Sequence, residues 1–153
     1  MNNNDILRQL RYALSLNNEA MMAVFEKAGM KQDLPSVIQL LKPTDDATCL
    51  ICDDSVLLAF LDGLILTKRG PNPNQSTAPQ IETLTNNLVL KKIRIALELK
   101  EEDMLAIMML ADFKMSKYEL SALFRRADHK NFRPCGNQIL RNFLRGLATH
   151  CRQ

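Results

Sequence analysis

The spacing Cys49-x-x-Cys52 is the feature of this chain that most resembles a metal or redox site. A structural zinc site needs four Cys or His ligands, so a pair of this kind supplies only half of it. No second pair at this spacing follows. The remaining candidates, all far along the chain, are Cys135, Cys151, His129 and His150. We therefore expect no metal and no other cofactor, and we interpret Cys52 as a small buried residue.

Asp128-His129-Lys130 combines an acid, a base and a cation, which are the residue types of general acid–base catalysis. No nearby residue supplies a nucleophile, and the chain has only two histidines. It also lacks a phosphate-cradling glycine loop and the H-E-x-x-H motif of metalloproteases. An enzyme that uses His129 is one interpretation, but we expect a protein without catalytic activity.

Positive charge is concentrated in the C-terminal part of the chain. Residues 1–85 carry 7 Lys/Arg and 10 Asp/Glu, a net charge of −3, whereas residues 86–153 carry 13 and 7, a net charge of +6. We predict a basic binding face from residues beyond position 124, which are Arg125, Arg126, His129, Lys130, Arg133, Arg141 and Arg145. Such a face would attract an acidic protein or the phosphates of a nucleic acid.

These basic residues belong to the second of two copies of one sequence. Ile93-Arg94-Ile95-Ala96-Leu97 repeats Leu10-Arg11-Tyr12-Ala13-Leu14, and Phe143-Leu144-Arg145-Gly146-Leu147 repeats Phe60-Leu61-Asp62-Gly63-Leu64, both at an offset of 83 residues. The same offset pairs Asn4 with Asn87 and Cys52 with Cys135. We therefore predict tandem copies at residues 4–70 and 87–153. The linker between them, residues 71–86, begins in a proline-rich stretch.

Each copy contains four segments with helical periodicity. The chain is rich in leucine and has no tryptophan, which also favours helix. In the first copy the four segments begin near Asp5, Asn18, Asp33 and Asp53. Asp33 and its counterpart Ser116 are both good N-caps, and Ser116 with Glu119 makes a capping box. The sequence thus predicts an all-α fold, a tandem duplication of a four-helix module.

Three charged positions are retained in both copies, at Arg11/Arg94, Glu19/Glu102 and Asp45/Asp128. A charge on an otherwise apolar helix usually has a partner, which predicts an ion pair between the helix-one arginine and one of these acids. Independent solvated charges are the alternative.

The fourth helix of the first copy is apolar almost all round, over residues 56–66. Its twin carries Arg141 and Arg145 at two of the aligned sites. A helix that is apolar on every side is buried on every side. We therefore expect Leu58, Ile65 and Leu66 to lie between the two copies or at the interface of a homo-oligomer.

The second and third helices of the second copy, joined by the turn 112–115, have the proportions of a helix-turn-helix. Nucleic-acid binding is therefore the alternative to binding an acidic protein. Helix pairs with short turns occur in every helical bundle, so the pattern does not decide between these two partners.

Three segments of the second copy resemble the YehS-like bacterial proteins. They are Asn87-Leu88-Val89-Leu90-Lys91-Lys92-Ile93-Arg94-Ile95-Ala96, Asp128-His129-Lys130-Asn131-Phe132-Arg133-Pro134-Cys135-Gly136-Asn137-Gln138 and Phe143-Leu144-Arg145-Gly146-Leu147. The resemblance covers both copies. This family is a domain of unknown function, so the resemblance implies a bacterial cytoplasmic protein but no activity, cofactor or site.

The first residues, Met1-Asn2-Asn3-Asn4-Asp5, have neither the basic nor the apolar region of a signal peptide. No apolar stretch approaches the roughly 18 residues of a membrane span. We expect a cytoplasmic protein with reduced cysteines and no membrane contact. The predicted function is a non-enzymatic helical interaction module that binds a protein or other acidic partner through the second copy.

Overall fold

The computed structural model describes residues 1–71 and 82–153, and within these ranges it contains helices but no strands. The helices are α1 (Asn3–Ala13), α2 (Asn18–Lys27), α3 (Leu34–Leu40), α4 (Asp54–Arg69), α5 (Asn86–Leu97), α6 (Glu101–Leu110), α7 (Lys117–Leu123) and α8 (Asn137–Arg152). Four belong to each copy, which confirms the predicted all-α fold and the tandem duplication. Of the predicted linker, residues 72–81 lie outside the described residues.

The helix boundaries follow local signals in the sequence. Asp33 caps α3 and Ser116 caps α7, each accepting a hydrogen bond from the backbone N–H three residues further on. The predicted N-caps are therefore confirmed. Helix two of each copy ends just before a residue with left-handed backbone, Gly29 at φ 79° and Asp112 at φ 57°. These two residues are also 83 positions apart, so both copies turn at the same place.

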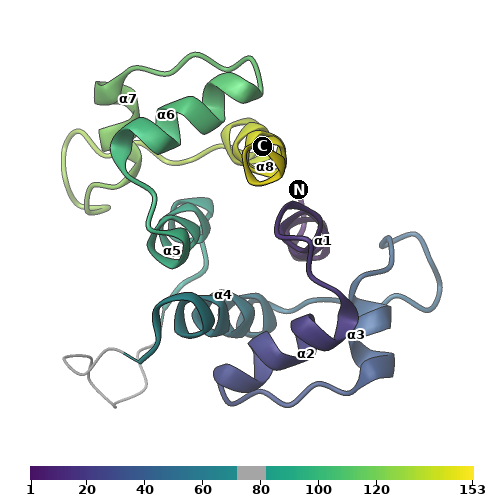
Figure 1. The fold of residues 1–153 in the computed structure, drawn as a ribbon. Coiled ribbons are helices and arrows are strands. Elements are labelled where there is room, and N and C mark those ends of the chain that lie inside the picture. The colour runs from purple at the N-terminus through teal and green to yellow at the C-terminus, as the bar shows by residue number, and fades with distance from the viewer. Residues whose placement is uncertain (72–81) are drawn as a thin grey trace.

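Helix one of each copy packs mainly against helix four of the other copy. α1 lies along α8 and α5 along α4, whereas α1 and α4, like α5 and α8, touch only slightly. Figure 1 shows these four helices around the centre, with α2 and α3 at one end and α6 and α7 at the other. The exchange is reciprocal, as in a two-fold symmetric dimer, and the buried residues of both copies form one core. None of the described helices is long and apolar enough to cross a membrane.

Two glycines allow helix four to approach helix two closely. A Cβ atom added to Gly63 would lie 1.9 Å from the carbonyl oxygen of Val24, and one added to Gly146 would lie 1.9 Å from that of Ile107. The backbones of α4 and α8 therefore rest directly on those of α2 and α6. Only glycine, which lacks a Cβ atom, permits this approach.

A buried asparagine at the start of helix one fastens the loop before helix four. The Nδ2 group of Asn4, a residue only 2% exposed, donates to the carbonyl oxygens of Leu40 at 3.0 Å and Leu50 at 2.9 Å. Its Oδ1 atom accepts from the backbone N–H of Cys52 at 3.0 Å. Asn87 makes the same three bonds with the aligned residues of the second copy. The shared asparagine therefore serves the fold.

The predicted ion pair of the helix-one arginine is wrong. Among the described residues neither Arg11 nor Arg94 lies within ion-pair distance of an acid. Arg94 donates instead to the carbonyl oxygen of Leu99 at 3.0 Å, and its guanidinium lies 4.7 Å from the centre of the Phe124 ring. A cation–π contact and a backbone acceptor thus replace the expected carboxylate.

Candidate functional site

Two grooves follow the two seams between the copies. The α4–α5 groove has a volume of about 1100 Å³, and the α1–α8 groove one of about 400 Å³. Eight of the nine residues that line the smaller groove have their counterpart, 83 positions away, in the larger one. The grooves are therefore one feature in duplicate, and their differences show how the copies have diverged.

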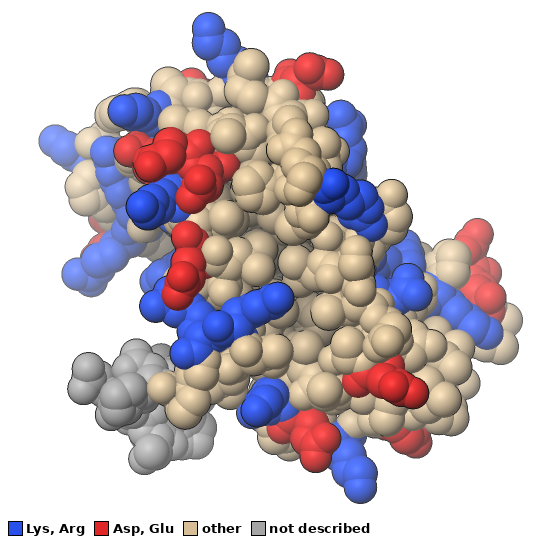
Figure 2. Space-filling view, in the orientation of Figure 1, with Lys and Arg blue, Asp and Glu red and all other residues tan. Residues whose placement is uncertain are grey.

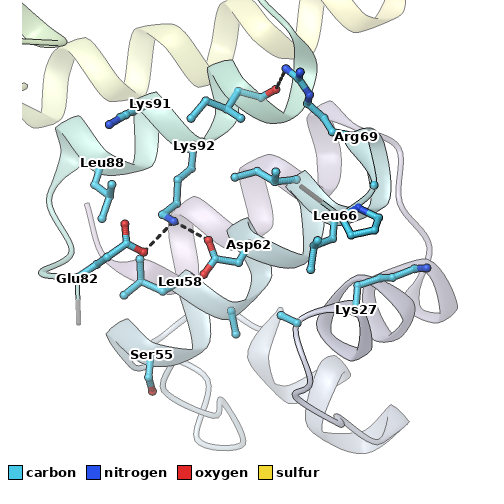
Figure 3. A pocket seen from close by; sticks show the side chains of 16 residues that line it. Lys27, Ser55, Leu58, Asp62, Leu66, Arg69, Glu82, Leu88, Lys91 and Lys92 are labelled. Atoms are coloured by element: carbon cyan, nitrogen blue, oxygen red, sulfur yellow. Dashed lines mark hydrogen bonds and ion pairs between the residues drawn. The ribbon is translucent and has the colours of Figure 1, made fainter. Parts of the chain in front are cut away.

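Charged side chains meet across the α4–α5 groove. The Nζ atom of Lys92 on α5 lies 2.5 Å from a carboxylate oxygen of Asp62 on α4 and 2.9 Å from one of Glu82 (Figure 3). Burial by itself would lower the pKa of Lys92, but the hydrogen bonds and charges of the two acids raise it above its usual value. Lys92 is therefore a charged, doubly paired group that holds the seam, and it is unsuited to act as a base.

The apolar residues predicted to lie at an interface line this same groove. Leu58, Ile65 and Leu66 are half-buried and lie opposite Leu88 and Ile95 of the second copy. The structure thus places them on the side of α4 that faces α5. Their involvement in a homo-oligomer stays a prediction.

An arginine at the end of each helix four fastens helix one of the other copy. Arg152 donates to the carbonyl oxygen of Tyr12 at 2.6 Å and lies 4.0 Å from the centre of its ring. Arg69 donates to the carbonyl oxygen of Ile95 at 3.3 Å, and its Nε atom lies 3.4 Å from Glu98. Both acceptors lie in the last turn of a helix, where a positive charge is favourable. The arginines of the two seams are therefore structural.

A third groove, which we call the loop groove, lies between the start of α5 and the loop that follows α7. Its volume is about 830 Å³. Basic, aromatic and other apolar side chains line it together with one acid, among them Arg125, Arg126, Lys91, Phe124, Phe132, Pro134 and Glu82. The loop groove therefore combines cations with an apolar wall, which is the usual make-up of a binding pocket.

Arg125 and Arg126 are the predicted basic residues that the structure brings together. The guanidinium of Arg125 lies 5.3 Å from the centre of the Tyr118 ring and donates to the carbonyl oxygen of Asn131 at 3.4 Å. Arg126 lies 3.3 Å from Asp128, and both side chains of this pair are largely exposed. Exposed pairs of this kind contribute little, so the guanidinium of Arg126 remains available to a partner, whereas that of Arg125 already contacts Tyr118 and Asn131.

The other predicted basic residues lie elsewhere. Arg133 lies 3.5 Å from Glu119, and Arg145 lines the α1–α8 groove. His129, Lys130 and Arg141 are exposed and line none of the three grooves. On the face in Figure 2, Lys and Arg are interspersed with Asp and Glu. Whether all seven residues serve one partner stays a prediction, but only Arg125 and Arg126 share a groove.

His129 is exposed, and its Nδ1 atom accepts a hydrogen bond from the backbone N–H of Asn131 at 3.0 Å. Its neighbour Asp128 pairs with Arg126. The acid and the base of the Asp128-His129-Lys130 motif are thus engaged with different partners within the loop.

Cys52 and Cys135, which occupy aligned positions in the two copies, are buried and unreactive. Burial raises the pKa of Cys52 to about 12 and that of Cys135 to about 11. Because the thiolate is the form that binds metals and attacks electrophiles, both side chains remain unreactive thiols. This confirms the interpretation of Cys52 as a small buried residue. Within residues 1–71 and 82–153, no three His, Cys, Asp or Glu side chains converge to hold a metal ion.

The seam ion pair is the feature that the sequence did not reveal. Lys92 and Asp62 come from different copies, and nothing in the sequence shows that α5 packs on α4. The repeat held one signal of this ion pair, because Lys92 aligns with Gln9 and Asp62 aligns with Arg145. A charge that differs between copies at two positions of otherwise apolar stripes can indicate a pair across a seam.

Comparison with known proteins agrees with the duplication. A family model described as "Protein of unknown function (DUF1456)" matches residues 3–70 and again residues 86–153. The chain is also 42% identical over 149 residues to "Uncharacterized protein YehS" of Escherichia coli (strain K12), covering 97% of this chain and 96% of that protein. No solved structure matches. The chain therefore belongs to the DUF1456 family of proteins of unknown function and carries two copies of its domain.

Proposed function

We propose that this protein is a non-enzymatic binding module that holds an acidic protein segment in the loop groove of its second copy. The observation that carries the proposal is the placement of Arg125 and Arg126 beside Phe124 and Phe132 along one groove of about 830 Å³. Guanidinium groups recognise carboxylates through paired hydrogen bonds, and aromatic walls bind apolar side chains. An acidic segment that also carries apolar residues offers both.

Divergence between the copies supports this choice of groove. The first copy has Lys42 and Pro43 where the second has Arg125 and Arg126, and it has Leu41 and Cys49 in place of the two phenylalanines. Since the remaining fold is shared, these replacements change the chemistry of the groove and leave the architecture in place. They are therefore best explained by a ligand that only the second copy binds.

A nucleic acid is the second candidate partner, supported by the same arginines and by the helix pair α6 and α7. We favour protein because Phe124, Phe132 and Pro134 give the loop groove apolar walls, which suit the apolar side chains of a protein segment. A seven-residue α7 also offers less surface to a DNA groove than the recognition helices of established helix-turn-helix proteins.

The setting that we propose is the bacterial cytoplasm. Four free cysteines suit a reducing compartment, and the curated relative comes from a bacterium.

Photo-crosslinking tests the proposed function, because Ala127 lines the loop groove, whereas Met109 on α6 is exposed and lies outside it. A benzophenone amino acid at position 127 in cells that express the full chain is expected to capture a protein through a segment with net negative charge. The adduct should resist nuclease and disappear when R125E and R126E are added.

The same probe at position 109 is the control and should not give this adduct. Equal capture from both positions, or an adduct that survives the arginine reversals, would contradict the proposal. A nuclease-sensitive adduct would show that the partner is a nucleic acid.

A further inference from the structure

We propose that the loop groove of one molecule binds the first copy of another molecule of this same chain, so that the protein associates head to tail. This inference rests on the proposed function and names the partner of its site.

The first observation is opposite charge on equivalent loops. The loop from residue 42 to residue 54 carries one lysine and four aspartates, a net charge of −3. Its counterpart from residue 125 to residue 137 carries four Lys/Arg and one aspartate, a net charge of +3. Two loops of one fold thus present opposite charge in the same place, which is the arrangement that favours pairing between molecules.

The second observation is an apolar surface that is larger on the first copy, since α7 of the second copy exposes only Tyr118 among its large apolar side chains. The largest exposed apolar side chains of α3 and of the loop after it are Leu34, Ile38, Leu50 and Ile51, and Ile51 is 62% exposed. At three of these positions the second copy has Lys117, Ser121 and Arg133. Single exposed apolar residues are ordinary, but four of them on one short helix and its loop indicate a contact surface.

The two surfaces are complementary in charge, and both carry apolar side chains. Ile51 is a projecting side chain two residues before Asp53, at the end of a loop that also presents Asp45. The loop groove is a recess with apolar walls beside Arg125 and Arg126. Insertion of Ile51 between those walls would bring its flanking carboxylates toward the guanidinium groups.

The placement of the loops determines the kind of assembly. Figure 1 shows α3 and the loop that follows it at the opposite side of the molecule from α7 and its loop. The two loops of one chain therefore cannot meet, and each molecule can bind one neighbour at either end. Such a heterologous contact extends into a row and does not close as a pair.

Sedimentation velocity of the full-length chain from about 10 µM to 1 mM, a range that covers weak contacts, tests this inference. At low salt the weight-average mass should rise steadily with concentration beyond that of a dimer, and added salt should reverse the rise. Ile51→Ser should abolish the rise. Met109→Ser, which removes a similarly exposed apolar side chain from α6, should not.

Two charge-neutralised variants provide the decisive experiment. D45N with D53N disables the acidic loop, and R125Q with R126Q disables the groove. Asp45 and Asp53 are chosen because Asp46 and Asp54 are hydrogen-bonded to Thr48 and Asn3. Each variant alone should remain a monomer. An equimolar mixture should form a one-to-one pair that grows no further, since it has one intact groove and one intact loop.

Recovery on mixing also shows that both variants are folded. A wild-type chain that stays monomeric up to about 1 mM at low salt overturns the inference, and so does a mixture that fails to pair. These outcomes are distinct from failure of the proposed function. The crosslink at position 127 would still identify a different acidic protein, and the earlier proposal would be refuted by the absence of that crosslink or by the contrary outcomes given with it.

Discussion

Replacement of Gly63 by alanine tests how closely α4 rests on α2. The added Cβ atom would lie 1.9 Å from the carbonyl oxygen of Val24, about 1.6 Å short of the roughly 3.5 Å at which nonbonded atoms begin to attract. The obstacle is backbone, so it cannot be relieved by a change of rotamer. The two helices must separate, and the side chains packed beside them, Phe25 and Phe60 with ring centres 5.4 Å apart, lose contact.

Overpacking of this kind costs about 1–3 kcal/mol, and an immovable obstacle favours the upper end of that range. Alanine returns about 1 kcal/mol through its better helix propensity. The free energy of unfolding should therefore fall by about 2 kcal/mol, or about 4–8 °C in Tm for a chain of this size. Gly146→Ala should behave alike, because its Cβ atom would meet the carbonyl oxygen of Ile107 at the same distance.

Urea denaturation followed by far-UV circular dichroism measures the change. Gly136→Ala is the control for added volume, since nothing lies within 4 Å of a Cβ atom there, and as the N-cap of α8 it should lose less than about 1 kcal/mol. If Gly63→Ala lowers the free energy of unfolding no more than Gly136→Ala does, the close approach of α2 and α4 is not as described and the reasoning fails.

Three further predictions concern the buried polar groups. Asn4→Ala removes three hydrogen bonds and should lower the free energy of unfolding by about 3 kcal/mol in urea denaturation, at about 1 kcal/mol for each bond; an unchanged midpoint would contradict its role. Lys92→Met leaves Asp62 and Glu82 unpaired but partly exposed, so about 1–2 kcal/mol should be lost near pH 7. The pKa of Lys92 is raised in the folded protein, so its contribution to the free energy of unfolding is complete below the unfolded-state pKa of about 10.4 and is lost as pH rises through the folded value. The melting temperatures of the wild type and of Lys92→Met should therefore converge at high pH. Burial raises the pKa of Cys52 to about 12, so the thiol ionises in the unfolded chain at a lower pH than in the folded one, and the free energy of unfolding falls above about pH 9. Cys52→Ala should recover about 2 kcal/mol of that loss at pH 10.5. Equal losses in the wild type and in Cys52→Ala would argue against this effect of Cys52.

The sequence predicted what local chemistry determines. The start of α3 at Asp33 and of α7 at Ser116 depends on a side chain and a backbone N–H three residues apart, so both could be recognised directly. The apolar stripe of each helix likewise follows from its own residues. The 83-residue offset then showed that the two sets of elements form the same module.

The sequence could not predict whether helix one packs on helix four of its own copy or of the other copy, because the repeat makes these two arrangements equivalent. Helix one of the first copy has the same apolar stripe as helix one of the second, and the same is true of helix four. Packing within a copy or between copies would therefore bury the same residue types. The pairing of Lys92 with Asp62 and the hydrogen bond from Arg152 to Tyr12 become visible only in the structure.

The candidate site was predicted in part. Arg125 and Arg126 are adjacent in the chain, so their shared location followed from the sequence. Arg145 is 20 positions further on, and the direction of α8 turns it toward the α1–α8 groove. The hypothesised pair between Arg94 and an acid failed because Phe124, an uncharged neighbour, satisfies the guanidinium with its ring.

During synthesis, α1 leaves the ribosome long before α8, its main packing partner. The hydrogen bond from Arg152 to Tyr12 spans 140 residues. Contacts so distant in sequence form slowly, and they cannot form until α8 has also emerged from the ribosome. The apolar side of α1, with Leu7 and Leu10, therefore lacks its main packing partner until α8 has been synthesised. A nascent chain that stalls before residue 137 lacks α8 and presents that side of α1 to chaperones or to aggregation.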